Sequence, residues 1–264
     1  MKKKNYESIS KNIRKNILQT AMMAGSSSAH IGGALSLVEI ISVLFEDKIK
    51  KSKKKEIKKL ILSKGHACLV LYSALKHFKF LTQTELNSFE KNGSILLGHP
   101  VRNISKGIEY SSGSLGMGLS YSAGLSHGFN LSNINHELFV ILGDGECNEG
   151  SVWEAAMTIS HHKLKNISVI LDMNGFQQTG RTQEILNLIN LKKKWKSFGW
   201  QILSINGHDF SQIKKAINKK TELPKIIIAK TKKGAGVKEF ENNNTWHHNI
   251  LTKSKYQQII KKIN

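Results

Sequence analysis

The chain has 264 residues, of which 39% are hydrophobic and 22% charged, a balance typical of soluble globular proteins rather than disordered or fibrous ones. Two cysteines are too few for a disulfide framework and no apolar stretch reaches the roughly 18 residues of a membrane span, so we expect a cytoplasmic protein. The net charge of +21 would attract phosphorylated ligands, but no nucleic acid-reading module accompanies the lysines, whose densest cluster (residues 50–59) we expect on a solvated helix face or loop.

The first half of the chain predicts helices joined by small-residue loops. Apolar residues at helical spacing predict helices over residues 9–24, 32–45, 67–77 and 119–129. A short apolar strand is expected at residues 59–63. Residues 92–118 are rich in Gly, Ser and turn signals, which predicts an irregular segment.

The second half alternates strands with helices. Strands are expected at residues 137–142, 167–171, 200–205 and 225–229, and helices at residues 151–162, 210–218 and 254–263. This alternation predicts an α/β fold with a mostly parallel central sheet and helices on both faces. We expect one domain over residues 1–264, with its ligand at the carboxyl ends of the strands and a short helix as its C-terminal tail.

Polar residues follow two of the expected strands. Gly143-Asp144-Gly145 ends one of them, and Asn174 ends the next. A carboxylate and an amide oxygen at neighbouring strand ends are hard ligands that suit Mg²⁺ or Ca²⁺. Gly145 would let the backbone approach a phosphate, and the start of the following helix favours an anion.

The run Gly143-Asp-Gly-Glu-Cys-Asn-Glu-Gly-Ser-Val-Trp-Glu154, followed by Asp172-Met-Asn174-Gly-Phe176, resembles the thiamine diphosphate fingerprint of the transketolase family. The resemblance implies a thiamine diphosphate-binding fold. It also implies that Asp144, Asn174 and the main-chain oxygen of Phe176 coordinate the metal, Mg²⁺ or Ca²⁺, that bridges the cofactor's diphosphate.

Further segments resemble the same family in the same order, so that the resemblance covers about residues 10–252. These segments are residues 28–36, 62–66, 97–100, 112–118 and 232–247. The resemblance assigns cofactor binding to His66, Gly113, Ser114, Leu115, Gly143, Asp144, Gly145, Glu146 and Asn174.

Four histidines lie beside glycines or turns at positions that match the family: His30, His66, His99 and His247. An isolated histidine in such a loop more often packs or forms a structural hydrogen bond. Four at family positions imply a catalytic role, in which they bind sugar oxygens and stabilise developing oxyanions. The carbon chemistry belongs to the cofactor. Six other histidines are expected to lie on the surface or in the core: His77, His127, His136, His161, His162 and His208.

Glu149 and Glu154 follow the Gly-Asp-Gly turn at the start of an expected helix. The family resemblance implies that they contribute to catalysis from a subunit contact that links two active sites. The alternative is that they cap the helix and stabilise its dipole.

The family also needs a Glu from a separate pyrimidine-binding domain, and no such domain follows here before residue 264. We therefore expect an N-terminal transketolase subunit that acts with a C-terminal subunit, as an α2β2 heterotetramer, to transfer a two-carbon ketol unit between phosphorylated or nucleotide-linked sugars. The alternatives are a carboligase similar to 1-deoxyxylulose-5-phosphate synthase, an α-subunit of pyruvate dehydrogenase type, and a non-catalytic or nucleic acid-binding protein on the same fold.

Four residues depart from the family pattern. Ile31 stands where Pro is common, and Met117 where relatives often have Gln. Gln177 and Gln178 follow the segment Asp172–Phe176, which together with Asp144 is here called the metal loop, in place of the Ser seen in many relatives. These departures leave the metal chemistry intact but leave the choice of sugar open.

Overall fold

Five parallel strands form the central sheet of the computed structural model, which describes residues 5–51 and 56–263. The strands are β1 (Ile57–Leu62), β2 (His136–Gly143), β3 (Ile167–Met173), β4 (Gln201–Asn206) and β5 (Lys225–Lys230). Their order in the sheet is β1-β2-β3-β5-β4, and each neighbouring pair is parallel. The predicted fold class is therefore confirmed, and all five predicted strands lie within two residues of their expected bounds.

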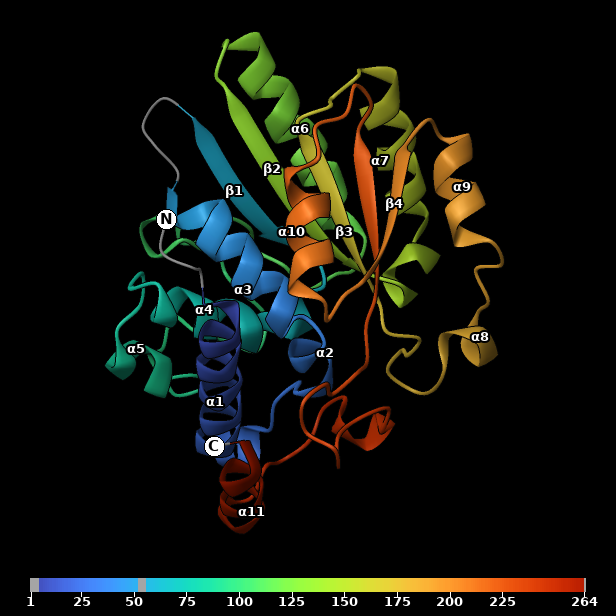
Figure 1. Cartoon of the computed structure of the whole chain (residues 1–264). Coiled ribbons are helices and arrows are strands. Elements are labelled where there is room, and N and C mark those ends of the chain that lie inside the picture. The colour runs from blue at the N-terminus through green and yellow to red at the C-terminus, as the bar shows by residue number, and fades with distance from the viewer. Residues whose placement is uncertain (1–4, 52–55, 264) are drawn as a thin grey trace.

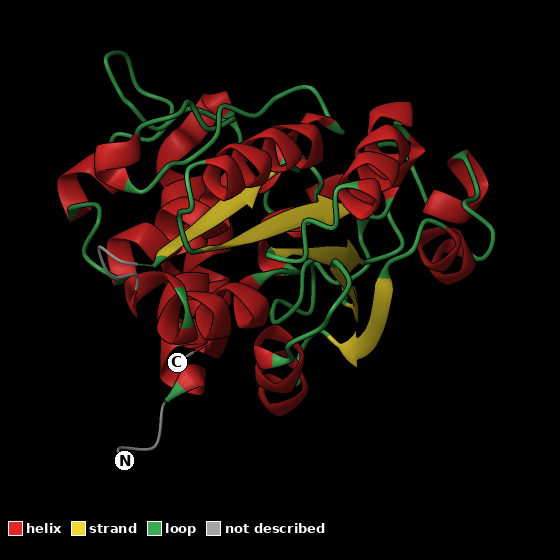
Figure 2. Ribbon diagram, turned by 90° about the horizontal axis from the view of Figure 1, so that it is seen from above, coloured by secondary structure: helices red, strands yellow, loops and turns green. Residues whose placement is uncertain are grey.

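Helices cover both faces of this sheet (Figures 1 and 2). On one face lie α3 (Val38–Asp47) and α10 (Phe210–Asn218), and α1 (Tyr6–Ala24) and α4 (Cys68–His77) extend the same core by packing against α3 and against each other. The other packs against α6 (Met117–Leu131), α7 (Gly150–His161) and α9 (Leu191–Ser197). The tail helix α11 (Lys253–Ile263) lies against α1. Three short helices, α2 (Gly32–Leu35), α5 (Gln83–Asn87) and α8 (Thr182–Ile185), lie in the connections.

The interior strand β2 shows how the chain forms two cores. Its residues alternate between them, because successive side chains of a strand point to opposite faces. Phe139 and Ile141 pack with the core beside α1 and α3, whereas Leu138, Val140 and Leu142 pack with the core beside α6 and α7. A strand buried on both faces carries a continuous apolar run, as β2 does from Leu138 to Leu142.

The helix predicted over residues 32–45 is interrupted, and this prediction was wrong in that respect. The structure has α2 and α3 instead, separated at Ser36 and Leu37. The hydroxyl of Ser36 donates to the main-chain oxygen of Gly33 and to the Asp172 carboxylate, at 2.9 and 2.6 Å. A contact with a strand end 136 residues away cannot be predicted from helical periodicity. The short helices α5, α8 and α9 were not predicted either.

The lysine cluster at residues 50–59 falls partly outside the described residues, which omit 52–55. Lys58 and Lys59 lie on β1 rather than on a helix or loop, and they form ion pairs with Glu137 and Glu109, respectively. Over the described ranges, no helix has the length and apolar character needed to cross a membrane.

Candidate functional site

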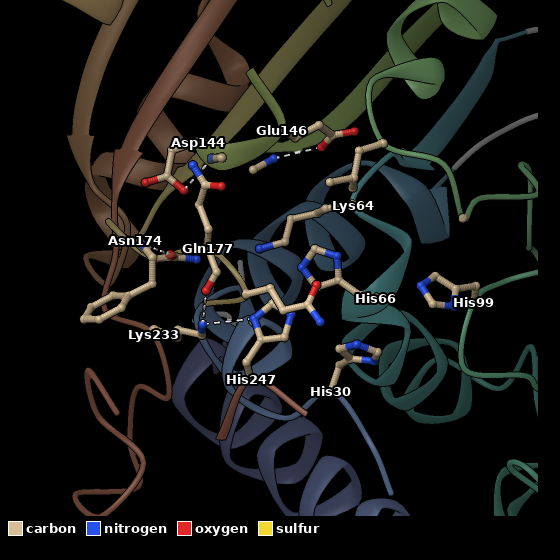
Figure 3. A pocket seen from close by; sticks show the side chains of 17 residues that line it. His30, Lys64, His66, His99, Asp144, Glu146, Asn174, Gln177, Lys233 and His247 are labelled. Atoms are coloured by element: carbon tan, nitrogen blue, oxygen red, sulfur yellow. Dashed lines mark hydrogen bonds between the residues drawn. The ribbon is translucent and has the colours of Figure 1, made fainter. Parts of the chain in front are cut away.

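A cavity of about 370 Å³, here called the strand-end cavity, lies beyond the carboxyl ends of β1, β2 and β3 (Figure 3). This is where the α/β sheet was expected to bind its ligand. The lining residues are His30, Gly33, Lys64, His66, His99, Gly113, Leu115, Gly143, Asp144, Gly145, Glu146, Asn174, Phe176, Gln177, Gln178, Lys233 and His247. The cavity thus joins the expected metal loop to all four predicted histidines.

Asp144 and Asn174 lie at the ends of neighbouring strands. Gly143 of β2 is in register with Asp172 of β3, and the Asp144 amide donates to the Asp172 main-chain oxygen at 3.2 Å. The Asp144 carboxylate accepts from the amides of Gly145 and Gly175, at 3.0 and 2.7 Å. These bonds orient the carboxylate at the edge of the cavity where Asn174 also lies.

The oxygen atoms available as metal ligands fit a hard divalent cation. Burial and then the charge of Asp172 raise the pKa of the Asp144 carboxyl to about 6, and no ion pair to Asp144 occurs within residues 5–51 and 56–263. The described residues contain no group of three or more His, Cys, Asp or Glu that could bind a metal, which disfavours a zinc-type site. One carboxylate with amide and main-chain oxygens matches Mg²⁺, which completes its shell with phosphate and water.

A buried ion pair lies beneath the cavity. The Lys64 ammonium is 2.5 Å from the Asp172 carboxylate, and the two side chains are 2% and 0% exposed. Asp172 also accepts from the Asn174 amide at 3.1 Å and from the Thr231 hydroxyl. Burial would raise the pKa of the Asp172 carboxyl, but Lys64 and the hydroxyl donors outweigh it and lower that pKa below its usual value. Asp172 therefore stays ionised and orients both Lys64 and Asn174.

Glu146 joins three segments of the cavity wall. One carboxylate oxygen accepts from the Ser63 hydroxyl at 2.5 Å and from the Gly116 amide at 2.9 Å. The other accepts from the Gly143 amide at 3.0 Å. Burial raises the pKa of the Glu146 carboxyl, and these three donors oppose that effect. Glu146 was predicted to line the diphosphate. It does line the cavity, but its carboxylate is occupied in connecting the ends of β1 and β2 to the turn before α6.

The turn before α6 presents open backbone to the cavity. Gly113 and Leu115 line the cavity, whereas Ser114 between them is exposed and does not. A Cβ at Gly113 would meet no atom within 4 Å, so a ligand can approach this backbone closely. Gly116 has φ +80°, and a Cβ there would lie 2.7 Å from that of Glu149. This glycine is required both by its left-handed backbone and by the close packing of α7.

The structure brings the four predicted histidines together. The ring centroid of His30 lies 5.6 Å from that of His66, 5.7 Å from His99 and 5.4 Å from His247. Those of His66 and His247 are 5.4 Å apart. The residues come from loops that lie far apart in the chain, and they form one wall of the cavity (Figure 3).

Three of these imidazoles are neutral at neutral pH. Burial is the main cause, and it lowers the pKa of His66 well below the usual value, with Lys64 as the next contributor. Burial followed by the charges of His248, His99 and Lys233 lowers the pKa of His30 to about 4. Burial followed by Lys233 lowers the pKa of His247 to about 3. A neutral imidazole can both donate and accept a hydrogen bond, which suits contact with sugar hydroxyls.

Lys233 is a site residue to which the motif analysis gave no role. Its ammonium donates to the main-chain oxygen of Gln177, to the Asn244 amide oxygen and to Nδ1 of His247, at 3.0, 2.6 and 3.0 Å. Burial and then the charge of Lys64 lower the pKa of Lys233 to about 8. Lys233 lies in the segment at residues 232–247 that resembles the family. The sequence cannot show whether Lys232 or Lys233 points into the cavity.

His248 lies beside these histidines, although it does not line the cavity. Its ring centroid is 4.3 Å from that of His30, and its Nε2 is 2.9 Å from the Ser28 hydroxyl. It lies directly after His247 at the exposed rim. Its adjacency to a predicted site residue was the available signal, although neighbours in a chain often point apart.

Glu149 and Glu154 do not line the strand-end cavity. Glu149 is the N-cap residue of α7, but its side chain makes no capping hydrogen bond, so the capping alternative is wrong for Glu149. Glu154 is exposed and lines a hollow between α6 and α7. A contact with another subunit stays a prediction for both residues.

Residues 7–263 match the family model described as transketolase, thiamine diphosphate binding domain. The chain is 33% identical over 257 residues to an apulose-4-phosphate transketolase subunit of Phocaeicola vulgatus, and the match covers 95% of this chain and 90% of that one. It is 32% identical over 238 residues to a 6-deoxy-6-sulfo-D-fructose transketolase subunit of a Clostridium species, covering 88% of this chain and 86% of that one.

The structure is also similar to that of transketolase from Campylobacter jejuni, with a TM-score of 0.81 and 29% identity. That match covers 97% of this chain and 42% of the other. The chain thus spans nearly the full length of the two relatives described as subunits, but only about two fifths of this transketolase.

Proposed function

Because this chain belongs to the transketolase family and contains its thiamine diphosphate-binding domain, we propose that it is one subunit of a two-subunit transketolase. The observation that carries this proposal is that the strand-end cavity joins the oxygens of Asp144 and Asn174 to four histidines. A metal-diphosphate site and a sugar-binding wall are the two parts that ketol transfer requires from this domain.

The second subunit is inferred from the relatives. Two relatives that match this chain over most of their length are described as transketolase subunits. The partner would supply the pyrimidine-binding domain, and we propose an α2β2 assembly. Glu149 and Glu154 would lie at the contact between subunits, where their exposure leaves them available.

The cofactor site follows from the geometry of the metal loop. Asp144, Asn174 and the main-chain oxygen of Phe176 would hold Mg²⁺ or Ca²⁺, and the open backbone at Gly113 would face the diphosphate. When bound, thiamine diphosphate supplies the carbanion that cleaves the donor ketose and carries the two-carbon unit. The chain's own task is to position these groups and to exclude water from them.

The histidines would act on the sugar. His30, His99 and His247 are placed to hydrogen-bond hydroxyl and carbonyl oxygens. The low pKa of His30 leaves it free to accept as well as donate, whereas Nδ1 of His247 accepts from Lys233 and leaves the other ring nitrogen to donate. The substrates would be phosphorylated or nucleotide-linked sugars. The net charge of +21 supports an anionic substrate, since a positive field raises the local concentration of anions.

The test is to produce the chain with the product of its neighbouring gene and to measure ketol transfer with thiamine diphosphate and Mg²⁺. The pair should transfer two-carbon units between sugar phosphates, and each chain alone should not. Robust transfer by the isolated chain would contradict the two-subunit proposal. Condensation of pyruvate with an aldehyde sugar phosphate, without ketol transfer, would instead favour the 1-deoxyxylulose-5-phosphate synthase-like reaction.

A further inference from the structure

The side chain of Gln177 fills the space beside Gly145 in the wall of the strand-end cavity. A Cβ added at Gly145 would lie 2.7 Å from Cγ and 3.1 Å from Cδ of Gln177. The glycine was expected to admit a phosphate close to its backbone. In the structure the glutamine side chain takes that place, so Gly145 accommodates a neighbouring residue. The open glycine of the cavity is Gly113, in the turn before α6.

The backbone of Gln177 is held on both sides, which fixes where its side chain starts. Its amide donates to the Gly180 main-chain oxygen at 2.8 Å, and its own main-chain oxygen accepts from the Lys233 ammonium at 3.0 Å. From there the side chain extends along the cavity toward the end of β2, where Asp144 lies (Figure 3). A positioned side chain of this kind loses little conformational entropy when it contacts a ligand.

The amide group at the end of this side chain is buried and unpaired. Nε2 of Gln177 has no hydrogen-bond partner among the described residues. Leaving a buried donor without an acceptor is unfavourable, which points to an acceptor that arrives with a ligand. The missing acceptor would be an oxygen inside the cavity, beside the metal loop.

We propose that Nε2 of Gln177 donates a hydrogen bond to a diphosphate oxygen of the cofactor, an inference that rests on the proposed function. Gln177 is then a cofactor-binding residue at a position where the family motif offers no guide, since many relatives carry Ser after the metal loop. The cofactor's diphosphate meets a side-chain donor here in addition to the metal and the main chain.

The test compares Gln177→Met and Gln177→Glu in the complex with the partner subunit, using calorimetry with thiamine diphosphate at saturating Mg²⁺. Methionine keeps the volume beside Gly145 but removes the donor, so the dissociation constant should rise about tenfold or more. Glutamate keeps the shape but places a carboxylate against an anion, so the loss should be larger. Gln183→Met, which replaces an exposed glutamine of α8, is the matched control and should bind as the native complex does.

Competition by Mg²⁺-pyrophosphate separates the diphosphate from the rest of the cofactor. Gln177→Met should weaken pyrophosphate binding by a similar factor. Two results would overturn the assignment of Gln177 and leave the proposed function intact. One is native affinity for thiamine diphosphate in the Gln177→Met complex, and the other is weaker binding of thiamine diphosphate with unchanged binding of pyrophosphate. Absence of cofactor binding by the native complex would overturn both.

Discussion

The ammonium of Lys233 donates a hydrogen bond to Nδ1 of His247 over 3.0 Å. An ammonium has only donors to offer, so Nδ1 must carry the lone pair and the proton of the neutral ring must lie on Nε2. Lys233 therefore selects the tautomer of His247 as well as its charge. If the site binds sugar hydroxyls as proposed, this leaves His247 with a donor to direct at an oxygen.

Replacing Lys233 with Met should raise the pKa of His247, now about 3, by about one pH unit or more. Burial would still lower it, but the second cause, the charge of the lysine, would be gone. Nitrogen chemical shifts of labelled imidazoles across a pH titration measure this directly. Lys232→Met is the matched control, because that ammonium pairs with Glu241 instead. An unchanged His247 in the Lys233 variant would contradict the assigned tautomer and charge effect.

Stability should fall with acidification, in part because of His30. Its pKa is about 4 in the folded chain and about 6.5 when unfolded, so between these values the unfolded state binds more protons. The free energy of unfolding therefore decreases as pH falls from about 6.5 to about 4. His30→Gln removes this contribution and should lose less stability between about pH 7 and pH 5 in urea titrations. Equal losses in both proteins would show that His30 does not carry the effect.

Breaking the buried ion pair should be costly. Lys64→Met leaves the fully buried Asp172 carboxylate without its cation, and we expect a loss of about 3–5 kcal/mol in the free energy of unfolding. The double variant Lys64→Met with Asp172→Leu removes both charges and should recover part of that loss. Urea denaturation of the two variants makes the comparison. A double variant less stable than the single one would show that the remaining donors to Asp172 matter more than the pair.

Removal of the proposed metal ligand Asp144 should weaken cofactor binding. Asp144→Ala in the complex should weaken thiamine diphosphate binding at least about 100-fold, because loss of a metal's outer partners alone costs about 10–100-fold. Chelation of Mg²⁺ from the native complex should have the same effect, measured by calorimetry. Thr182→Val is the control: it removes the 3.4 Å bond to Asp144 without removing a ligand, so its effect should be small. Normal cofactor affinity in the Asp144 variant would contradict the metal site.

Most of the fold could be predicted from local patterns. Apolar runs and helical spacing located five strands and most of the longer helices, because burial on both faces of a parallel sheet leaves a strong signal in each strand. The short helix α5 was missed although its capping box, Thr82 with Glu85, was present in the sequence. The break between α2 and α3 could not be predicted, since it depends on Ser36 reaching Asp172.

The sequence by itself determined the family and the set of residues proposed for its site. Asp144 and Asn174 follow neighbouring strands, and four histidines occupy turn positions, so the residue types and their order along the chain predicted which residues line one cavity. Only the tertiary structure decided how these residues are oriented and charged. Lys233 points inward, Glu146 joins three segments, and Gln177 covers Gly145. Each depends on contacts between distant segments, and burial and neighbouring charges, which set the pKa values, exist only once the chain has folded.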